Sequence, residues 1–215
     1  TFEMLSTGNV PENNETNMPG DGNNENNYYS NNKYNPKKRL PYQNFHNLYI
    51  KDRLFEKVSP YLLNESKKPI GKLLDIGSGK GGDISRWKKY KFAEVVGIDC
   101  DLKNIEYSKK LFNNIPRPKP KTFFIRGDAS ELIFPSQSAA FTESNKLRLK
   151  SYIPIKNYFD VASIQFALHY FFEDEIKLRT LIQNVSDNLK INGFFIGTCF
   201  SGERIFETLK KNKEI

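Results

Sequence analysis

LLDIGSGKGGD (residues 73–83) joins a short apolar run to a segment rich in glycine. Its apolar first part, ending at Ile76, predicts a buried strand that the glycines end sharply. After Gly82 the apolar spacing becomes helical. Glycines permit backbone angles closed to other residues and let a ligand approach the main chain, where N–H groups at a helix start are free to bind it. The stretch therefore predicts a nucleotide-binding loop.

An acidic residue follows the loop at the end of a second apolar run. Residues 95–99 read VVGID and predict a strand that ends in Asp99. A carboxylate about 20 residues after such a loop can accept both ribose hydroxyls of NAD or of S-adenosylmethionine. The glycines alone also fit the dinucleotide fingerprint, which is a weak signal by itself. A dehydrogenase is the least favoured interpretation, because the sequence offers no residues for hydride transfer.

Composition bounds the class of protein. The 215 residues suffice for one α/β domain with a core. No run approaches the roughly 18 apolar residues of a membrane span, and no signal peptide is visible. Two isolated cysteines, Cys100 and Cys199, favour a reducing, intracellular compartment and argue against a disulfide framework or a metal site. The net charge of +8 suits a polyanionic partner.

The chain divides into two parts by composition. Residues 1–40 are rich in Asn, Gly and Pro and predict a disordered tail or linker, because such a segment buries too little apolar surface to offset its ordering entropy. Residues 41–215 predict the folded domain. Within it, residues 135–156 show no clear periodicity and are interpreted as a surface insertion that could contain one helical turn.

Predicted strands and helices alternate along the domain, which indicates a parallel, three-layer α/β sheet. Strands are expected at 72–76, 94–98, 122–125, 158–166 and 194–200, and helices at 44–63, 83–90, 102–112, 173–189 and 203–210, with a turn at Asn192-Gly193. Ligands of such sheets bind at the carboxyl ends of the strands. That edge should hold Gly77, Asp99, Asp128, Gln165 and His169. Asp128 could hold an adenine amino group, although a helix cap explains it almost as well.

At this point the chain resembles the mRNA cap guanine-N7 methyltransferases. The resemblance covers about residues 44–210 outside the insertion. It is carried by LDIGSGKGGD (74–83) with WKK (87–89), QFALHY (165–170) and GFFIGT (193–198). It implies a Rossmann-like class I methyltransferase fold that uses S-adenosylmethionine. The Asn-rich tail and the TCFSG ending (198–202) are more similar to capping enzymes of large DNA viruses.

The resemblance also implies roles for individual residues. Those that match cofactor contacts are Lys51, Gly77, Asp99, Asp128, Gln165 and Tyr170; those on the cap side are Asn47, Lys80, Arg86 and His169. His169 and Tyr170 would align the reactants, and no residue is expected to act as a general base. The amino-terminal helix has one residue more than the usual pattern. It therefore stays open whether His46 or Asn47 faces the guanine.

The activity implied by the resemblance is methyl transfer to guanine N7 of the 5′ cap of mRNA. N7 carries a lone pair and no proton, so alignment and electrostatics should suffice. Capped mRNA is the expected partner, and other capping-enzyme domains or the RNA polymerase machinery are further candidates. No association with a membrane is expected. The site of action would be the nucleus for a cellular protein, or the host cytoplasm or viral factory for a viral one. Because family members continue beyond a fifth strand, the fold is expected to be truncated there.

Two alternatives remain, one within the same class of enzyme and one from a different class. One is a different S-adenosylmethionine-dependent methyltransferase that acts on tRNA or on a small molecule. The other is a non-catalytic module that binds a nucleoside or RNA. The intact glycine loop and Asp99 disfavour a module without activity.

Overall fold

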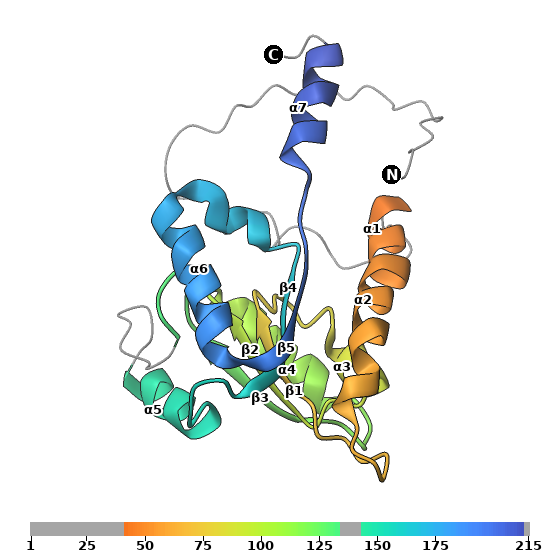
Figure 1. The fold of residues 1–215 in the computed structure, drawn as a ribbon, viewed down its shortest axis with the longest axis vertical. Coiled ribbons are helices and arrows are strands. Elements are labelled where there is room, and N and C mark those ends of the chain that lie inside the picture. The colour runs from red at the N-terminus through yellow and green to blue at the C-terminus, as the bar shows by residue number, and fades with distance from the viewer. Residues whose placement is uncertain (1–40, 134–142, 213–215) are drawn as a thin grey trace. The chain divides into compact units, whose positions relative to one another are not determined.

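A computed structural model describes residues 41–133 and 143–212 of the chain (Figure 1). The predicted tail at 1–40 lies outside these residues, so the boundary at residue 40 stays a prediction. No helix in the described ranges is long and apolar enough to cross a membrane. The same ranges contain no group of three or more His, Cys, Asp or Glu side chains that could hold a metal ion.

A single five-stranded parallel sheet forms the centre of the domain, as predicted. Its order is β3-β2-β1-β4-β5. The first two strands are buried almost throughout, which explains why they appear in the sequence as continuous apolar runs. The bounds are β1 Lys72–Ile76, β2 Glu94–Asp99, β3 Lys121–Arg126, β4 Phe159–Gln165 and β5 Leu189–Thr198.

Helices cover both faces of the sheet and create two apolar cores (Figure 1). On one face, α2 (Lys51–Val58), α3 (Ile84–Lys89) and α4 (Leu102–Asn113) pack with Phe55, Trp87 and Ile105 among their buried side chains. On the other, α5 (Glu143–Tyr152) and α6 (Glu175–Asn188) contribute side chains such as Leu149 and Leu181. This arrangement confirms the three-layer α/β class.

Side-chain caps explain where several helices begin. Asp101 accepts the Lys103 N–H at the start of α4, and Asp174 accepts the Lys177 N–H at the start of α6. Each cap satisfies a backbone donor that the first helical turn leaves without a partner. α7 (Gly202–Lys211) is capped by Ser201, extends away from the sheet and buries none of its side chains (Figure 1).

The amino-terminal helix is not the regular element predicted at 44–63. It consists of α1 (Pro41–Phe45), a π-helix η3 (His46–Ile50), α2 and a 3₁₀ turn η4 (Ser59–Leu62). The extra residue noted in the sequence is accommodated by the π-helix, whose i→i+5 bond runs from the Lys51 N–H to the His46 carbonyl. The helical pattern was therefore identified correctly, but the local widening was not.

The interpretation of residues 135–156 as a surface insertion is wrong for its second half. α5 occupies Glu143–Tyr152, and Leu149 and Ile153 are buried in the core. Tyr152 stacks on Phe123 of β3 with ring centroids 3.5 Å apart. The apolar side chains of this helix are too sparse to produce a visible period, so its sequence resembles a loop. Residues 134–142 lie outside the described part of the chain.

The turn predicted at Asn192-Gly193 lies within β5. The strand runs from Leu189 to Thr198, and its pairing with β4 shifts register between Phe159 and Val161. Asn192 has a φ of 65°, which bends the chain locally without ending the strand. The aromatic stretch after β4 forms a 3₁₀ helix, η5 (Leu168–Glu173).

Candidate functional site

The glycine loop joins β1 to α3 at the carboxyl edge of the sheet. Gly77, Gly79 and Gly81 have φ values of 66°, 54° and 76°, a region that side-chain-bearing residues rarely adopt. A Cβ atom on Gly79 would meet nothing closer than 4.0 Å, and one on Gly82 would meet nothing within 4 Å. The loop therefore has open space beside its backbone at these two positions, whereas a Cβ atom on Gly77 would meet Ala167 at 2.7 Å and one on Gly81 would meet Ile84 still closer. Lys80 lies half-buried between these glycines.

Asp99 ends β2 and faces this loop. Its Oδ2 accepts the Gly79 N–H at 2.7 Å, and its Oδ1 accepts the Asp101 N–H at 3.0 Å and the Asn104 Nδ2 at 3.1 Å. The carboxylate thus fixes the position of the glycine loop as well as its own. Asp128, after β3, is exposed and accepts the Ser130 N–H at 2.8 Å. No helix begins there, so the helix-cap alternative is wrong, and contact of Asp128 with an adenine amino group stays a prediction.

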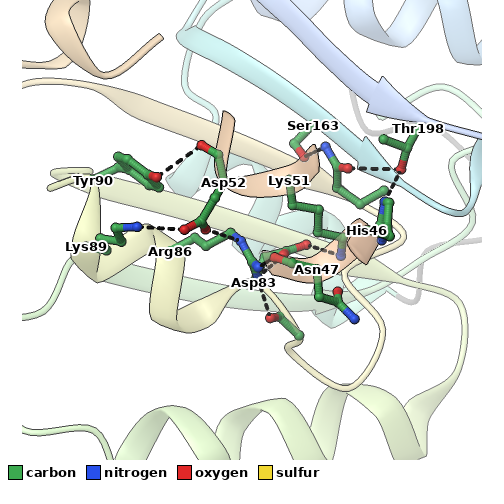
Figure 2. Close-up of polar contacts among 12 residues, drawn as sticks. His46, Asn47, Lys51, Asp52, Asp83, Arg86, Lys89, Tyr90, Ser163 and Thr198 are labelled. Atoms are coloured by element: carbon green, nitrogen blue, oxygen red, sulfur yellow. Dashed lines mark hydrogen bonds and ion pairs between the residues drawn. The ribbon is translucent and has the colours of Figure 1, made fainter. Parts of the chain in front are cut away.

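A buried group of ion pairs joins the amino-terminal helix to α3 (Figure 2). Lys51 Nζ lies 2.9 Å from Asp83 Oδ2, and Arg86 Nη1 lies 3.0 Å from the other oxygen. Arg86 Nε donates to Asp52 at 2.9 Å, and its Nη2 donates to the Asn47 carbonyl. The Asp83 side chain makes no capping bond at the start of α3. Its carboxylate pairs with the two cations instead.

A second polar chain crosses the carboxyl ends of β4 and β5. Gln165 Nε2 donates to Ser163 Oγ at 3.2 Å, and its Oε1 accepts the Thr198 hydroxyl at 3.1 Å. His46 Nε2 lies 2.9 Å from the same hydroxyl oxygen. Burial, reinforced by the positive charges of Lys51 and Arg86, lowers the pKa of His46 to about 4, although Asp83 opposes this. His46 is therefore neutral at physiological pH.

Beneath the loop, Asp75 is almost completely buried. Burial and the negative charge of Asp83 raise the pKa of its carboxyl well above the usual value, although Lys51 and a hydrogen bond with Ser163 oppose the shift. The raised pKa favours the neutral form of Asp75, in which repulsion of the Asp83 carboxylate is smaller.

Aromatic side chains form the rim after β4. The rings of His169 and Tyr170 lie 4.3 Å apart between centroids, and Phe200 lies 5.4 Å from His169. His169 Nδ1 is buried and has no hydrogen-bond partner. Burial lowers the pKa of His169, so its ring is neutral and offers one donor and one acceptor. Tyr170 is largely exposed.

Comparison with known proteins identifies the family. The mRNA (guanine-N(7))-methyltransferase domain matches residues 12–215. The chain belongs to this family. The mRNA cap guanine-N(7) methyltransferase of Schizosaccharomyces pombe is 34% identical over 167 residues, which cover 78% of this chain and 41% of that protein. That of Cryptococcus neoformans is 33% identical over 144 residues, 67% of this chain and 22% of the relative.

A viral relative and a solved structure extend the comparison. The protein named "Probable mRNA-capping enzyme" of Acanthamoeba polyphaga mimivirus is 30% identical over 159 residues, 67% of this chain and 13% of its own length. The chain thus spans less than half the length of each of these curated relatives. An S-adenosylmethionine-dependent methyltransferase from Clostridium acetobutylicum shares the fold, with a TM-score of 0.52 at 17% identity over 78% of this chain and 60% of that one.

Within this methyltransferase domain, the residues predicted for the cofactor gather along the carboxyl edge of the sheet. Gly77 and Asp99 follow or end adjacent strands, Gln165 ends β4, and Lys51 reaches the loop through Asp83. Lys51 and Gln165 are buried and already bonded within the chain. Their direct contact with a ligand stays a prediction.

The residues predicted for the cap side differ in how far they are buried and bonded within the chain. Arg86 is buried, and each of its nitrogens is bonded to Asp52, Asp83 or a main-chain carbonyl. Phosphate binding by Arg86, still a prediction, would require some of these contacts to be exchanged. Of the two alternatives on the amino-terminal helix, His46 faces inward to Thr198, whereas Asn47 is half-buried. Sequence reasoning missed Thr198 and Asp83, each of which bonds to more than one polar side chain. Asp83 belongs to the LDIGSGKGGD motif, but the neighbouring sequence does not indicate which residues it pairs with.

Proposed function

We propose that this chain transfers a methyl group from S-adenosylmethionine to guanine N7 of the mRNA cap. The match of the cap methyltransferase domain to residues 12–215 carries this proposal. The site geometry supports it, because the open glycine loop and the Asp99 carboxylate lie together at the carboxyl edge of the sheet. Another methyltransferase activity is disfavoured, since the curated relatives described above are cap methyltransferases or a capping enzyme.

The residues present fit an adenosine cofactor. Gly79, in a left-handed conformation, and Gly82 leave backbone beside open space, and Asp99 provides a carboxylate for a ribose. Three chain donors already occupy Asp99, and a carboxylate has about four acceptor positions. We expect the Asn104 amide to give way when both ribose hydroxyls bind. When bound, S-adenosylmethionine supplies a methyl group already activated by its sulfonium.

The chain's own residues then bind and orient the acceptor. His169 faces the guanine with a neutral ring, and its buried Nδ1 has no partner in the chain, so a small shift of the aromatic rim would let it bond to the guanine. Lys80 binds the triphosphate as a cation, and Tyr170 and Gln165 position the methyl donor. No residue needs to remove a proton, because N7 carries none. The alignment of the reacting atoms therefore provides most of the catalysis.

Methyl transfer to a defined cap tests the proposal. The full 215-residue chain is incubated with radiolabelled S-adenosylmethionine and either GpppA-ended RNA, the same RNA with a 5′ triphosphate, or tRNA. Label is expected only on the GpppA-ended RNA, released as 7-methylguanosine after digestion. Label on tRNA, or on the internal nucleotides of the triphosphate RNA, would refute the proposal.

In this proposal His169 acts on the capped RNA and Tyr170 on the methyl donor. His169→Ala should raise KM for capped RNA and leave S-adenosylhomocysteine affinity nearly unchanged, since uniform substrate binding affects KM more than turnover. Tyr170→Ala should lower kcat more strongly, with some loss of cofactor affinity. Equal loss of both ligands in a destabilised His169→Ala protein would show that the residue packs rather than binds.

A non-catalytic role makes a different prediction. A binding module would retain affinity for the GpppA dinucleotide and for S-adenosylhomocysteine in calorimetry, yet label none of the RNAs. The same protein preparation therefore separates the two classes of function.

A further inference from the structure

The turn after β4 has an unusual backbone. Phe166 has a φ of 58°, a left-handed conformation that is a genuine outlier for a bulky residue. Gln165 precedes this turn, and His169 and Tyr170 follow it within four residues. The directions of these three side chains therefore depend on Phe166 staying in its strained conformation. Such strain persists only where surrounding contacts enforce it.

Two residues distant in sequence supply those contacts. The Phe166 N–H donates to the Thr198 carbonyl at 3.0 Å and to the Thr198 hydroxyl at 3.2 Å. The His46 ring lies against the Phe166 ring, with centroids 3.9 Å apart. We call His46, Thr198 and Phe166 the His46 latch (His46 and Thr198 are labelled in Figure 2).

All hydrogen-bonding positions of the Thr198 hydroxyl have partners, and this determines which tautomer His46 adopts. A hydroxyl has one donor and two acceptor positions. Its hydrogen goes to Gln165 Oε1, and one acceptor position takes the Phe166 N–H. The remaining position can only accept a hydrogen from His46 Nε2, which lies 2.9 Å away. The geometry thus assigns the Nε2–H tautomer to His46.

The π-helix explains why His46 can reach Thr198. His46 and Lys51 are both buried, and they lie five residues apart. In a regular α-helix such residues would point about 140° apart around the axis. The wider turn of η3 lets both face inward, so that His46 contacts Thr198 while Lys51 pairs with Asp83.

We propose that His46 is a positioning residue, which acts through Thr198 to hold the Phe166 turn and thereby orients Gln165, His169 and Tyr170. It contacts neither substrate. Its effect on turnover rests on the proposed function, because those three residues are assigned there to cofactor and cap. Its effect on the structure of the turn does not. The low pKa of His46 agrees with this arrangement, since the neutral ring keeps one tautomer at physiological pH.

Three variants separate the contacts of the latch. His46→Phe keeps a ring against Phe166 but removes the hydrogen bond, whereas His46→Gln can place an amide nitrogen near the position of Nε2. Thr198→Val removes the hydroxyl without changing the size of the side chain. The matched control is Thr122→Val on β3, whose hydroxyl bonds only locally to the Pro120 carbonyl at 3.2 Å.

Kinetics on capped RNA provide the first readout. His46→Phe and Thr198→Val should lower kcat about tenfold, the scale of one lost hydrogen bond that aligns reactants. His46→Gln should recover most of this loss, and Thr122→Val should match the wild type. Thr198→Val should also weaken S-adenosylhomocysteine several-fold, because Gln165 loses its partner. Folded His46→Phe with wild-type kcat, or His46→Gln no better than His46→Phe, would overturn the proposal.

Ring ¹⁵N spectra provide a readout that is independent of activity. The chain has only two histidines, so His46→Gln assigns both ring signals. We expect wild-type His46 to show the Nε2–H tautomer at neutral pH, and Thr198→Val, but not Thr122→Val, to shift the His169 signal. An Nδ1–H tautomer for His46, or an unmoved His169 signal, would overturn the latch even if the protein methylates caps. Inactivity of the wild type with these shifts intact would refute only the proposed function.

Discussion

At the scale of single residues, the Asp99 carboxylate at the end of β2 fixes the backbone of the glycine loop. One carboxylate holds the Gly79 N–H, the Asp101 N–H and the Asn104 amide. Charge-assisted hydrogen bonds of this kind are about twice as strong as neutral ones. Asp99 thus shapes the backbone that would meet the cofactor in addition to its expected contact with the ribose.

Asp99→Ala should therefore weaken S-adenosylhomocysteine binding by roughly 1.5–3 kcal/mol and also lower the melting temperature. Calorimetric titration and thermal unfolding measure the two effects. The matched control is Asp101→Ala, which removes the α4 cap at Lys103 and should cost about 1 kcal/mol of stability while cofactor affinity stays unchanged. Unchanged affinity in folded Asp99→Ala would remove the residue from the site.

His46 should make stability depend on pH in a defined window. Its pKa is lowered from 6.5 to about 4, chiefly by burial, with Lys51 and Arg86 acting in the same direction and Asp83 against it. Between these values the unfolded chain binds a proton that the folded chain does not. Stability is therefore undiminished above pH 6.5 and falls as the pH drops toward 4, by up to about 3 kcal/mol.

The free energy of unfolding of wild type and His46→Gln, measured by urea titration from pH 4 to 7, tests this window. The stability of the wild type relative to the variant should decrease steadily below pH 6.5, because the other groups titrate alike in both proteins. A difference that stays constant with pH would show that His46 titrates normally.

At the scale of elements, a buried group of ion pairs joins the amino-terminal helix to α3 beside their shared apolar core. Asp83 carries one contact from Lys51 and one from Arg86, and all three side chains are buried. Removing one partner from a buried ion group leaves an uncompensated charge, which costs far more than an exposed pair contributes. The position of the helix that bears His46 depends on this group.

Asp83→Asn should consequently lower the free energy of unfolding by about 3–5 kcal/mol, since Lys51 and Arg86 lose their shared counterion. Chemical denaturation measures the change. Glu175→Gln is the control, because the exposed pair of Glu175 with Arg179 should contribute only about 0.3–0.5 kcal/mol. Similar losses in both variants would mean that burial of the ion pairs has little energetic effect.

α5 offers an internal comparison between two leucines. Leu149 is fully packed in the core, whereas Leu147 on the same helix is 68% exposed. Leu149→Ala should cost about 2–5 kcal/mol through lost burial and the cavity left behind. Leu147→Ala should stay within about 0.5 kcal/mol of the wild type. Equal effects, measured by urea unfolding, would contradict the packing of α5 on the sheet.

At the scale of the whole molecule, the net charge of +8 favours the body of an RNA as well as its cap. Each additional phosphate contacted should steepen the dependence of log affinity on log salt by about 0.7 for a single strand. A capped 20-nucleotide RNA should therefore lose affinity with salt more steeply than the GpppA dinucleotide. Fluorescence anisotropy at several salt concentrations tests this, and equal slopes would confine RNA contact to the cap.

The sequence alone was sufficient wherever the signal is local. The run 73–76, the glycines after it and Asp99 at the end of a second apolar run predicted two strands, the loop and the edge at which the site lies. The two strands and the loop beside Asp99 are confirmed, and ligand binding at this edge stays a prediction. The reason is that periodicity, glycine conformation and parallel crossovers depend on neighbouring residues. α5 escaped prediction because only two of its side chains, Leu149 and the partly buried Tyr152, pack on the core.

Only the tertiary structure could decide which polar groups meet. Arg86 pairs with Asp52, 34 residues away, and His46 meets Thr198, 152 residues away. Residue types and motif matches could predict that Arg86 and either His46 or Asn47 lie near a cap. They could not reveal that Arg86 is already bonded within the chain or that His46 faces inward. Such contacts arise because packing of helices on the sheet buries these groups, and a buried polar group must find a partner within reach.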